Sequence, residues 1–199
     1  MASIVLNLLI VGMTVAAVIL VMRENGKWVP ARLRKAPRYF TFLSNVYCAA
    51  ASLLMAVSAL SGDVPEWIWI LKYIGTVALT VTMLTVFLFL APSIGKGWEK
   101  ILLGGHDLFM HVLTPVAALI SFCVFEKRGM SFARSLWGLA FIAFYGPLYL
   151  RKTVWAPEGK RWDDFYGFNR KGNNWPISYA CMLVGTFLIC MALMAIQNA

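Results

Sequence analysis

Long, nearly uncharged apolar blocks dominate this sequence and constrain its fold more than any other feature. Each block is about as long as the roughly 20-residue helix that crosses a bilayer. Backbone polar groups in lipid must be hydrogen-bonded within the segment, which favours helices. We therefore predict an all-α integral membrane protein with six transmembrane helices in one compact bundle. The predicted spans are Ala2–Met22, Phe40–Leu60, Trp67–Ala91, Asp107–Phe125, Phe132–Leu150 and Pro176–Ile196.

The composition supports this class. Of the 199 residues, 60% are hydrophobic and 14% are charged, whereas soluble domains carry about 25% charged residues. No loop is long enough to hold a second domain, so residues 1–199 are predicted to form a single six-span transmembrane domain. The first block is longer than the apolar core of a signal peptide and is predicted to remain as a span.

The positive charge lies in loops, and the net charge is +9. Loops one, three and five hold fourteen Lys and Arg residues, against three in loops two and four. The positive-inside rule then predicts that odd-numbered loops are cytoplasmic and both termini are outside. Anionic lipid headgroups account for the basic loops, so no nucleic-acid partner is predicted.

Four cysteines lie inside apolar blocks without a C-x-x-C pair, and we interpret them as small buried hydrophobes. They are Cys48, Cys123, Cys181 and Cys190. Neither a metal site nor a cofactor is predicted from this pattern.

The second block carries a polar stripe of Thr41, Asn45, Cys48 and Ser52, with Ser44 beside it. Their spacing of i, i+4, i+7 and i+11 puts them on one helical face. Small polar residues commonly pack between membrane helices, which suffices for Cys48 and Ser52. The Asn45 amide needs hydrogen-bond partners and should face the bundle.

The fourth block carries Asp107, His111 and Thr114 on one face, before Pro115, which is expected to kink the helix. An ionisable residue inside a span is a functional-site candidate. Two purely structural alternatives stay open. His111 could be a hydrogen-bonded polar side chain inside the bundle, and Asp107 could be a charge at the helix amino terminus that the helix dipole stabilises.

Thr41 and His111 are predicted to lie at similar depth near the cytoplasmic boundary. A hydroxyl and an imidazole there suit a nucleophile and its general base. Asp107 would orient the ring, and Asn45 or Ser44 would donate to an oxyanion. Alternatively, Asn45 only braces the helices and takes no part in the reaction.

The fifth loop mixes aromatic residues with both signs of charge. It is either an interfacial segment or a lid that offers Asp163 or Asp164 to His111. Three further interpretations concern polar residues outside the stripes. Lys72 is expected to snorkel to the outer edge, Asn7 to hold helices together, and Glu126 to be solvated.

Three segments together resemble the androgen-induced membrane protein family: "YFTFLSN" (Tyr39–Asn45), "HVLTP" (His111–Pro115) and "WDDFYGFN" (Trp162–Asn169). Members are six-span intramembrane threonine hydrolases of fatty-acid esters of hydroxy fatty acids. The resemblance implies that Thr41 is the nucleophile and His111 its partner, in a bacterial-type member.

The leading prediction is an intramembrane lipid-ester hydrolase with a Thr nucleophile and a His general base. Its partners would be an ester substrate with acyl chains and the membrane lipids. A non-catalytic lipid-binding or scaffold protein is the alternative, and a small transporter ranks third. The natural substrate and the oligomeric state stay open.

Overall fold

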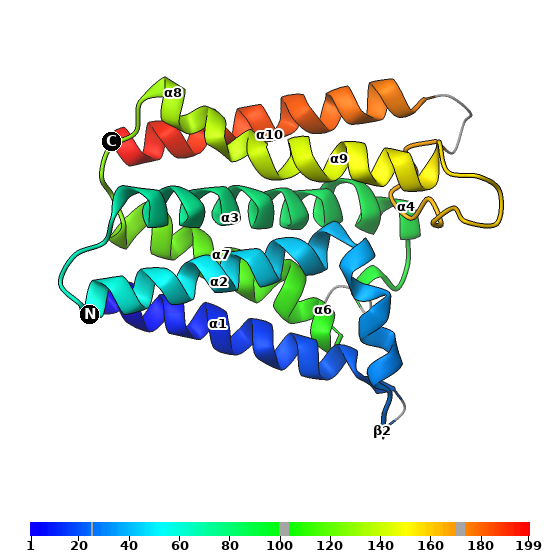
Figure 1. Ribbon diagram of the computed structural model, residues 1–199, viewed down its shortest axis with the longest axis horizontal. Helices are drawn as coiled ribbons and strands as arrows, with labels where there is room; N and C mark the ends of the chain where they lie inside the picture. Colours follow the sequence, from blue (N-terminus) through cyan, green and yellow to red (C-terminus); the bar gives the residue numbers. More distant parts are fainter. Residues whose placement is uncertain (25, 100–103, 170–173) are drawn as a thin grey trace.

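The computed structural model describes residues 1–24, 26–99, 104–169 and 174–199, and it is a bundle of helices that run back and forth along one axis (Figure 1). Within this described part, five helices are long and apolar enough to cross a membrane. These are Ala2–Val21 (α1), Phe40–Leu60 (α2), Glu66–Leu90, His106–Phe125 and Trp175–Asn198 (α10).

Two of the long helices change their winding along their length. The third consists of α3 (Glu66–Thr85) and a π-helical segment η3 (Val86–Leu90), after which α4 (Ala91–Ile94) continues. The fourth consists of α6 (His106–Leu108), the π-helical η4 (Phe109–Leu113), α7 (Thr114–Ile120) and the π-helical η5 (Ser121–Phe125).

The fifth apolar block is helical but segmented. It consists of α8 (Phe132–Ser135), a 3-10 turn η6 (Leu136–Leu139) and α9 (Ala140–Thr153), and Pro147 lies inside α9. A proline removes one backbone hydrogen bond and crowds the preceding turn. The all-α prediction is confirmed, whereas only five of the six predicted spans are single helices of spanning length.

The two ends of the bundle differ. Both termini lie at one end, and the first, third and fifth loops lie at the other (Figure 1). The first loop contains the two-residue strands β1 (Arg23–Glu24) and β2 (Lys27–Trp28), followed by the 3-10 turns η1 (Pro30–Arg34) and η2 (Ala36–Arg38). The basic loops therefore gather at one end, as alternating up-and-down helices require.

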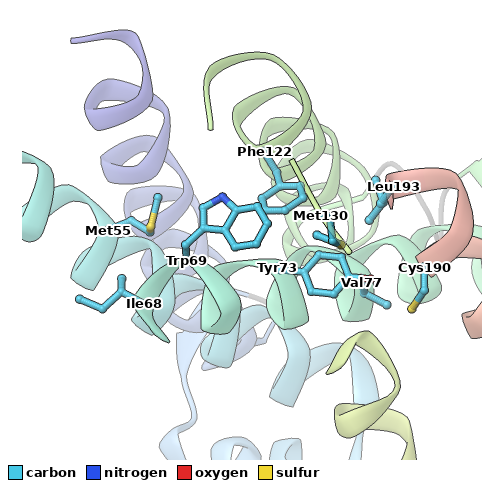
Figure 2. Close-up of a cluster of buried hydrophobic side chains, with 9 residues drawn as sticks. All are labelled: Met55, Ile68, Trp69, Tyr73, Val77, Phe122, Met130, Cys190 and Leu193. Carbon is cyan, nitrogen blue, oxygen red and sulfur yellow. The ribbon is translucent and has the colours of Figure 1, made fainter. Parts of the chain in front are cut away.

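Helix α3 is the centre of the packing, between α1, α2 and α7 on one side and α9 and α10 on the other (Figure 1). A Cβ atom at Gly75 would lie 2.9 Å from the Cα of Cys48, so this glycine lets α2 approach closely. Figure 2 shows the apolar cluster nearest the termini, in which the Trp69 and Tyr73 rings lie against Phe122 at 5.2 and 5.5 Å.

The outward faces of the bundle are apolar. Val5 on α1, Leu188 on α10 and Phe144 on α9 are 62%, 61% and 79% exposed. Monomeric soluble proteins rarely expose contiguous apolar surfaces of this kind. The surface therefore agrees with a membrane protein.

The prediction that all four cysteines are buried is only partly confirmed. Cys48 and Cys190 are buried, Cys123 is half-buried and Cys181 is exposed, and all four are free thiols. Cys181 is exposed because α10 packs against the bundle along few of its positions.

Lys72 does not snorkel, which corrects the sequence interpretation. Its side chain is fully buried, and its ammonium donates hydrogen bonds to the Asn7 Oδ1 and the Ser52 Oγ, both at 2.7 Å. The central position of α3 turns Lys72 towards α1 and α2 instead of the surface. A buried charge must be compensated inside the protein, and these two acceptors do so.

Glu126 is likewise buried and not solvated. Its Oε1 accepts hydrogen bonds from Ser3 at 2.9 Å, Asn7 at 2.6 Å and Ser121 at 2.7 Å. The Asn7 amide thus points its oxygen at the ammonium of Lys72 and its nitrogen at the carboxylate of Glu126. This Lys72–Asn7–Glu126 network joins α1, α2, α3 and η5 near the chain termini.

We expect Lys72→Met to lower the free energy of unfolding by about 3–5 kcal/mol, because it leaves Glu126 as an uncompensated buried charge. Adding Glu126→Gln should recover part of that loss, since the remaining network is neutral. Denaturant unfolding in detergent micelles measures both values. The control is Lys152→Met, which alters an exposed lysine at the end of α9. A loss for Lys72→Met no larger than for this control contradicts the network's role.

Candidate functional site

A cavity of about 1170 Å³ lies at the end of the bundle opposite the termini. The first turn of α2, the end of α3, η3, η4, α9, the fifth loop and the start of α10 form its walls. Thr41, Asp107 and His111 all line it. The fold therefore brings these three predicted site residues to one cavity.

Thr41 lies in the first turn of α2. Pro37 ends the basic loop in the 3-10 turn η2, and Tyr39 takes an extended conformation before the helix starts at Phe40. The first backbone N–H groups of any helix lack partners within the helix. Thr41 is therefore at the cavity wall in a helix turn whose N–H groups need partners from outside the helix.

His111 lies in the π-helical segment η4, three residues before Thr114 and four before Pro115. Pro115 has no backbone N–H to donate to the carbonyl of His111, and the helix widens at this point, as single π turns often do at functional sites. The sequence predicted a disturbance here, and the structure specifies it as a π turn.

Asp107 lies beside the His111 ring. The distance from His111 Nδ1 to Asp107 Oδ1 is 3.6 Å, and His106 Nε2 approaches the same oxygen at 3.5 Å. His111 is only 9% exposed, and its Nδ1 is the enclosed nitrogen. The His111 side chain lines the cavity.

Asn45 connects the two helices that carry Thr41 and His111. Its Nδ2 donates to the Thr41 carbonyl at 2.8 Å and to the Met110 carbonyl at 3.1 Å. One buried amide thus holds the backbone beside each of the two residues. The second and fourth long helices are therefore neighbours in the structure. Residue spacing within a single helix could not determine this.

Ser44 and Asn45 do not line the cavity. The Ser44 hydroxyl donates to the Thr41 carbonyl at 3.1 Å and lies 3.0 Å from the Thr82 hydroxyl. Both Asn45 amide hydrogens go to backbone carbonyls, so these two side chains brace the start of α2. Cys48 packs in an apolar cluster with Ile10.

The fifth loop covers part of the cavity through Phe165, Tyr166 and Phe168. The Asp164 carboxylate accepts hydrogen bonds from the Tyr149 hydroxyl at 2.8 Å and from two backbone N–H groups, of Phe168 at 3.0 Å and Asn169 at 2.8 Å. Asp164 therefore organises the loop itself. Asp163 is exposed, and Asp107 is the carboxylate in contact with His111.

Tyr166 is a site residue that the sequence analysis did not single out. Its hydroxyl accepts a hydrogen bond from the Phe40 N–H at 2.8 Å and interacts with Thr41. Burial raises the pKa of Tyr166 to about 12. The "WDDFYGFN" segment is selected from the sequence for its family resemblance and for Asp163 and Asp164, whereas Tyr166 of the same segment makes the contact with the start of α2.

The cavity joins apolar walls to a charged mouth. Val81, Leu84, Ile142 and Met182 lie on its inner surface. At the loop end, its lining includes the exposed cations Arg32 and Lys35 and the carboxylate Glu24, which pairs with Arg32 at 3.6 Å. Such a cavity fits an elongated apolar molecule with a polar end. Within the described residues, no cluster of three or more His, Cys, Asp or Glu side chains suits a metal ion.

Comparisons of the chain with protein-family models, with curated proteins and with solved structures found no match. The geometry and chemistry of this cavity are therefore the basis for assigning a function.

We expect Asn45→Ala to lower the free energy of unfolding by about 1–3 kcal/mol, because it leaves the buried Met110 carbonyl without a donor. Thermal unfolding in detergent, converted to free energy, measures the loss. Ser61→Ala is the matched control, since Ser61 also donates to a backbone carbonyl of α2 but is exposed. Equal effects of the two substitutions would show that Asn45 does not connect the helices.

Proposed function

We propose that this protein is an intramembrane lipid-ester hydrolase, with Thr41 as nucleophile and His111 as general base, and a bacterial-type member of the androgen-induced membrane protein family. One observation carries the proposal: Thr41, His111 and Asp107 line the same largely apolar cavity. The expected substrates are fatty-acid esters of hydroxy fatty acids or similar acyl esters.

The reaction would proceed in two steps. The Thr41 oxygen attacks the ester carbonyl while His111 Nε2 takes its proton, and the tetrahedral intermediate collapses as His111 returns that proton to the leaving alcohol. Water then attacks the acyl-Thr41 ester with His111 again as base, which releases the carboxylic acid. Asp107 next to Nδ1 favours the tautomer and the cationic ring that this proton transfer needs.

The membrane supplies the substrate in this proposal. Three cavity-lining residues, Leu88, Phe89 and Ile177, are 61%, 66% and 68% exposed on the outer face of the bundle. An acyl chain can therefore enter from the side, between η3 and α10. The helical run from α8 to α9 would complete six crossings, with the odd-numbered loops cytoplasmic.

We expect an alkyl fluorophosphonate to label the wild-type protein in membranes and to leave Thr41→Ala unlabelled, because only an activated hydroxyl reacts with such a probe. His111→Ala should lower both labelling and ester turnover by about 100-fold or more. Fluorescence of the labelled band in a gel and release of free fatty acid measure the two effects.

Thr80→Ala is the control for these variants. Thr80 is a buried threonine of α3 whose hydroxyl donates to the Thr76 carbonyl at 2.8 Å, and it lies outside the cavity lining. Labelling that persists in Thr41→Ala, or full turnover in His111→Ala, rejects the assignment of the two residues.

Lipid binding without catalysis is a second candidate. Two observations favour it. The cavity is large enough for an acyl chain, and among the described residues no hydrogen bond joins Thr41 to the His111 ring. This candidate predicts that a fluorescent fatty acid binds the wild-type protein and Thr41→Ala equally, and that no ester is turned over. A transporter would instead move a solute in proteoliposomes.

The orientation has its own test in intact cells. In a Cys181→Ser background, a membrane-impermeant maleimide should react with Ser61→Cys and reach Lys160→Cys only after permeabilisation, because positive loops are retained in the cytoplasm. Both positions are exposed. The loop between α2 and α3, which contains Ser61, and the loop between α9 and α10, which contains Lys160, lie at opposite ends of the bundle (Figure 1). The reverse labelling pattern would place the cavity on the outer side.

A further inference from the structure

The Tyr166 hydroxyl lies against the amino terminus of α2, although 126 residues separate it from Phe40. It accepts the Phe40 N–H at 2.8 Å and interacts with both the backbone and the side chain of Thr41. Tyr166 also lines the cavity together with Thr41 and His111. A phenolic hydroxyl therefore lies next to the nucleophile of the proposed reaction.

The groups around the Tyr166 hydroxyl determine which acceptors its hydrogen can reach. Because the Tyr166 oxygen accepts N–H groups from the helix start, its own O–H is polarised and becomes a stronger donor. Among the hydrogen bonds between described residues, none has the Tyr166 hydroxyl as donor. The Tyr145 hydroxyl, which also approaches it, gives its own hydrogen to the Arg38 carbonyl at 2.6 Å. A ligand oxygen in the cavity would compete with the neighbouring Thr41 and Tyr145 hydroxyls for the Tyr166 hydrogen.

The Tyr166 ring is held in place by its neighbours. Its backbone N–H donates to the Tyr149 hydroxyl at 3.2 Å, and its ring packs against those of Tyr149 at 5.2 Å and Phe165 at 4.7 Å. Burial keeps the phenol protonated at neutral pH, since the pKa of Tyr166 is raised to about 12. An oxyanion donor needs this combination of a fixed position and a retained proton.

We propose that the Tyr166 hydroxyl, beside Thr41 in the cavity, is the oxyanion donor of the hydrolase. This inference rests on the proposed function. As the bond from Thr41 Oγ to the ester carbon forms, the carbonyl electron pair moves onto its oxygen, and Tyr166 donates a hydrogen bond to that oxygen without transferring its proton. The Thr41 proton moves to His111. Ser44 and Asn45, expected in this role from the sequence, have their hydrogens bonded inside the bundle.

The test uses Tyr166→Phe, which retains the ring and removes only the hydroxyl. An acyl ester and its thionoester, in which sulfur replaces the carbonyl oxygen, are the two substrates for the full-length protein in detergent. We expect kcat for the ester to fall on the order of 10²–10³-fold, with KM changed far less. Thionoester turnover should fall much less, because sulfur is a weak hydrogen-bond acceptor. The ester-to-thionoester rate ratio should therefore collapse.

Tyr47→Phe is the matched control. Tyr47 is on α2 and packs on Phe141 at 5.3 Å between ring centres, and it lies outside the cavity lining. Unchanged kcat in Tyr166→Phe overturns the inference. So does an equal loss with both substrates, which is the signature of a structural role. If Thr41→Ala abolishes turnover in the same assay, the proposed function survives either result. Absence of wild-type turnover overturns both proposals.

Discussion

Polar groups on apolar helices must find partners inside the bundle, and the rest of this structure depends on that constraint. Water is absent from a bilayer core, so an unpaired amide or charge there is costly. Asn7 satisfies the constraint at one end by bridging Lys72 and Glu126. The amide nitrogen of Asn45 satisfies it at the other end by donating to the Thr41 and Met110 carbonyls. The hydrogen bonds of these two amides connect the first four long helices of the bundle.

The two polar centres have different surroundings, which suits different roles. The side chains of the Lys72–Asn7–Glu126 network are buried. The same helices also carry a buried apolar cluster that includes Ile10, Cys48 and Leu79. The Asn45 centre adjoins a large cavity. Stability therefore belongs mainly to the first centre, whereas the second leaves a hydroxyl, an imidazole and a phenol open to a ligand.

Helix irregularity contributes to the chemistry at the cavity. A π turn places His111 where Pro115 removes a backbone donor, and the start of α2 places Thr41 among N–H groups without helical partners. In both cases a local defect in the hydrogen-bond ladder supplies the polar site. The fifth loop then adds Tyr166 to the α2 terminus, where its hydroxyl replaces a missing carbonyl acceptor for Phe40.

The sequence by itself determined the helices and three cavity residues. Blocks of apolar residues locate α1, α2, the helix Glu66–Leu90 and α10 within a few positions. Thr41, Asp107 and His111 stand out because ionisable or hydroxyl groups at the edge of such blocks are conspicuous. Tertiary structure alone decided that Lys72 is enclosed, that Asn45 braces two helices and that Tyr166 meets Thr41. The reason is geometric: periodicity relates residues one or two turns apart on one helix, whereas these contacts join segments 65 to 126 residues apart.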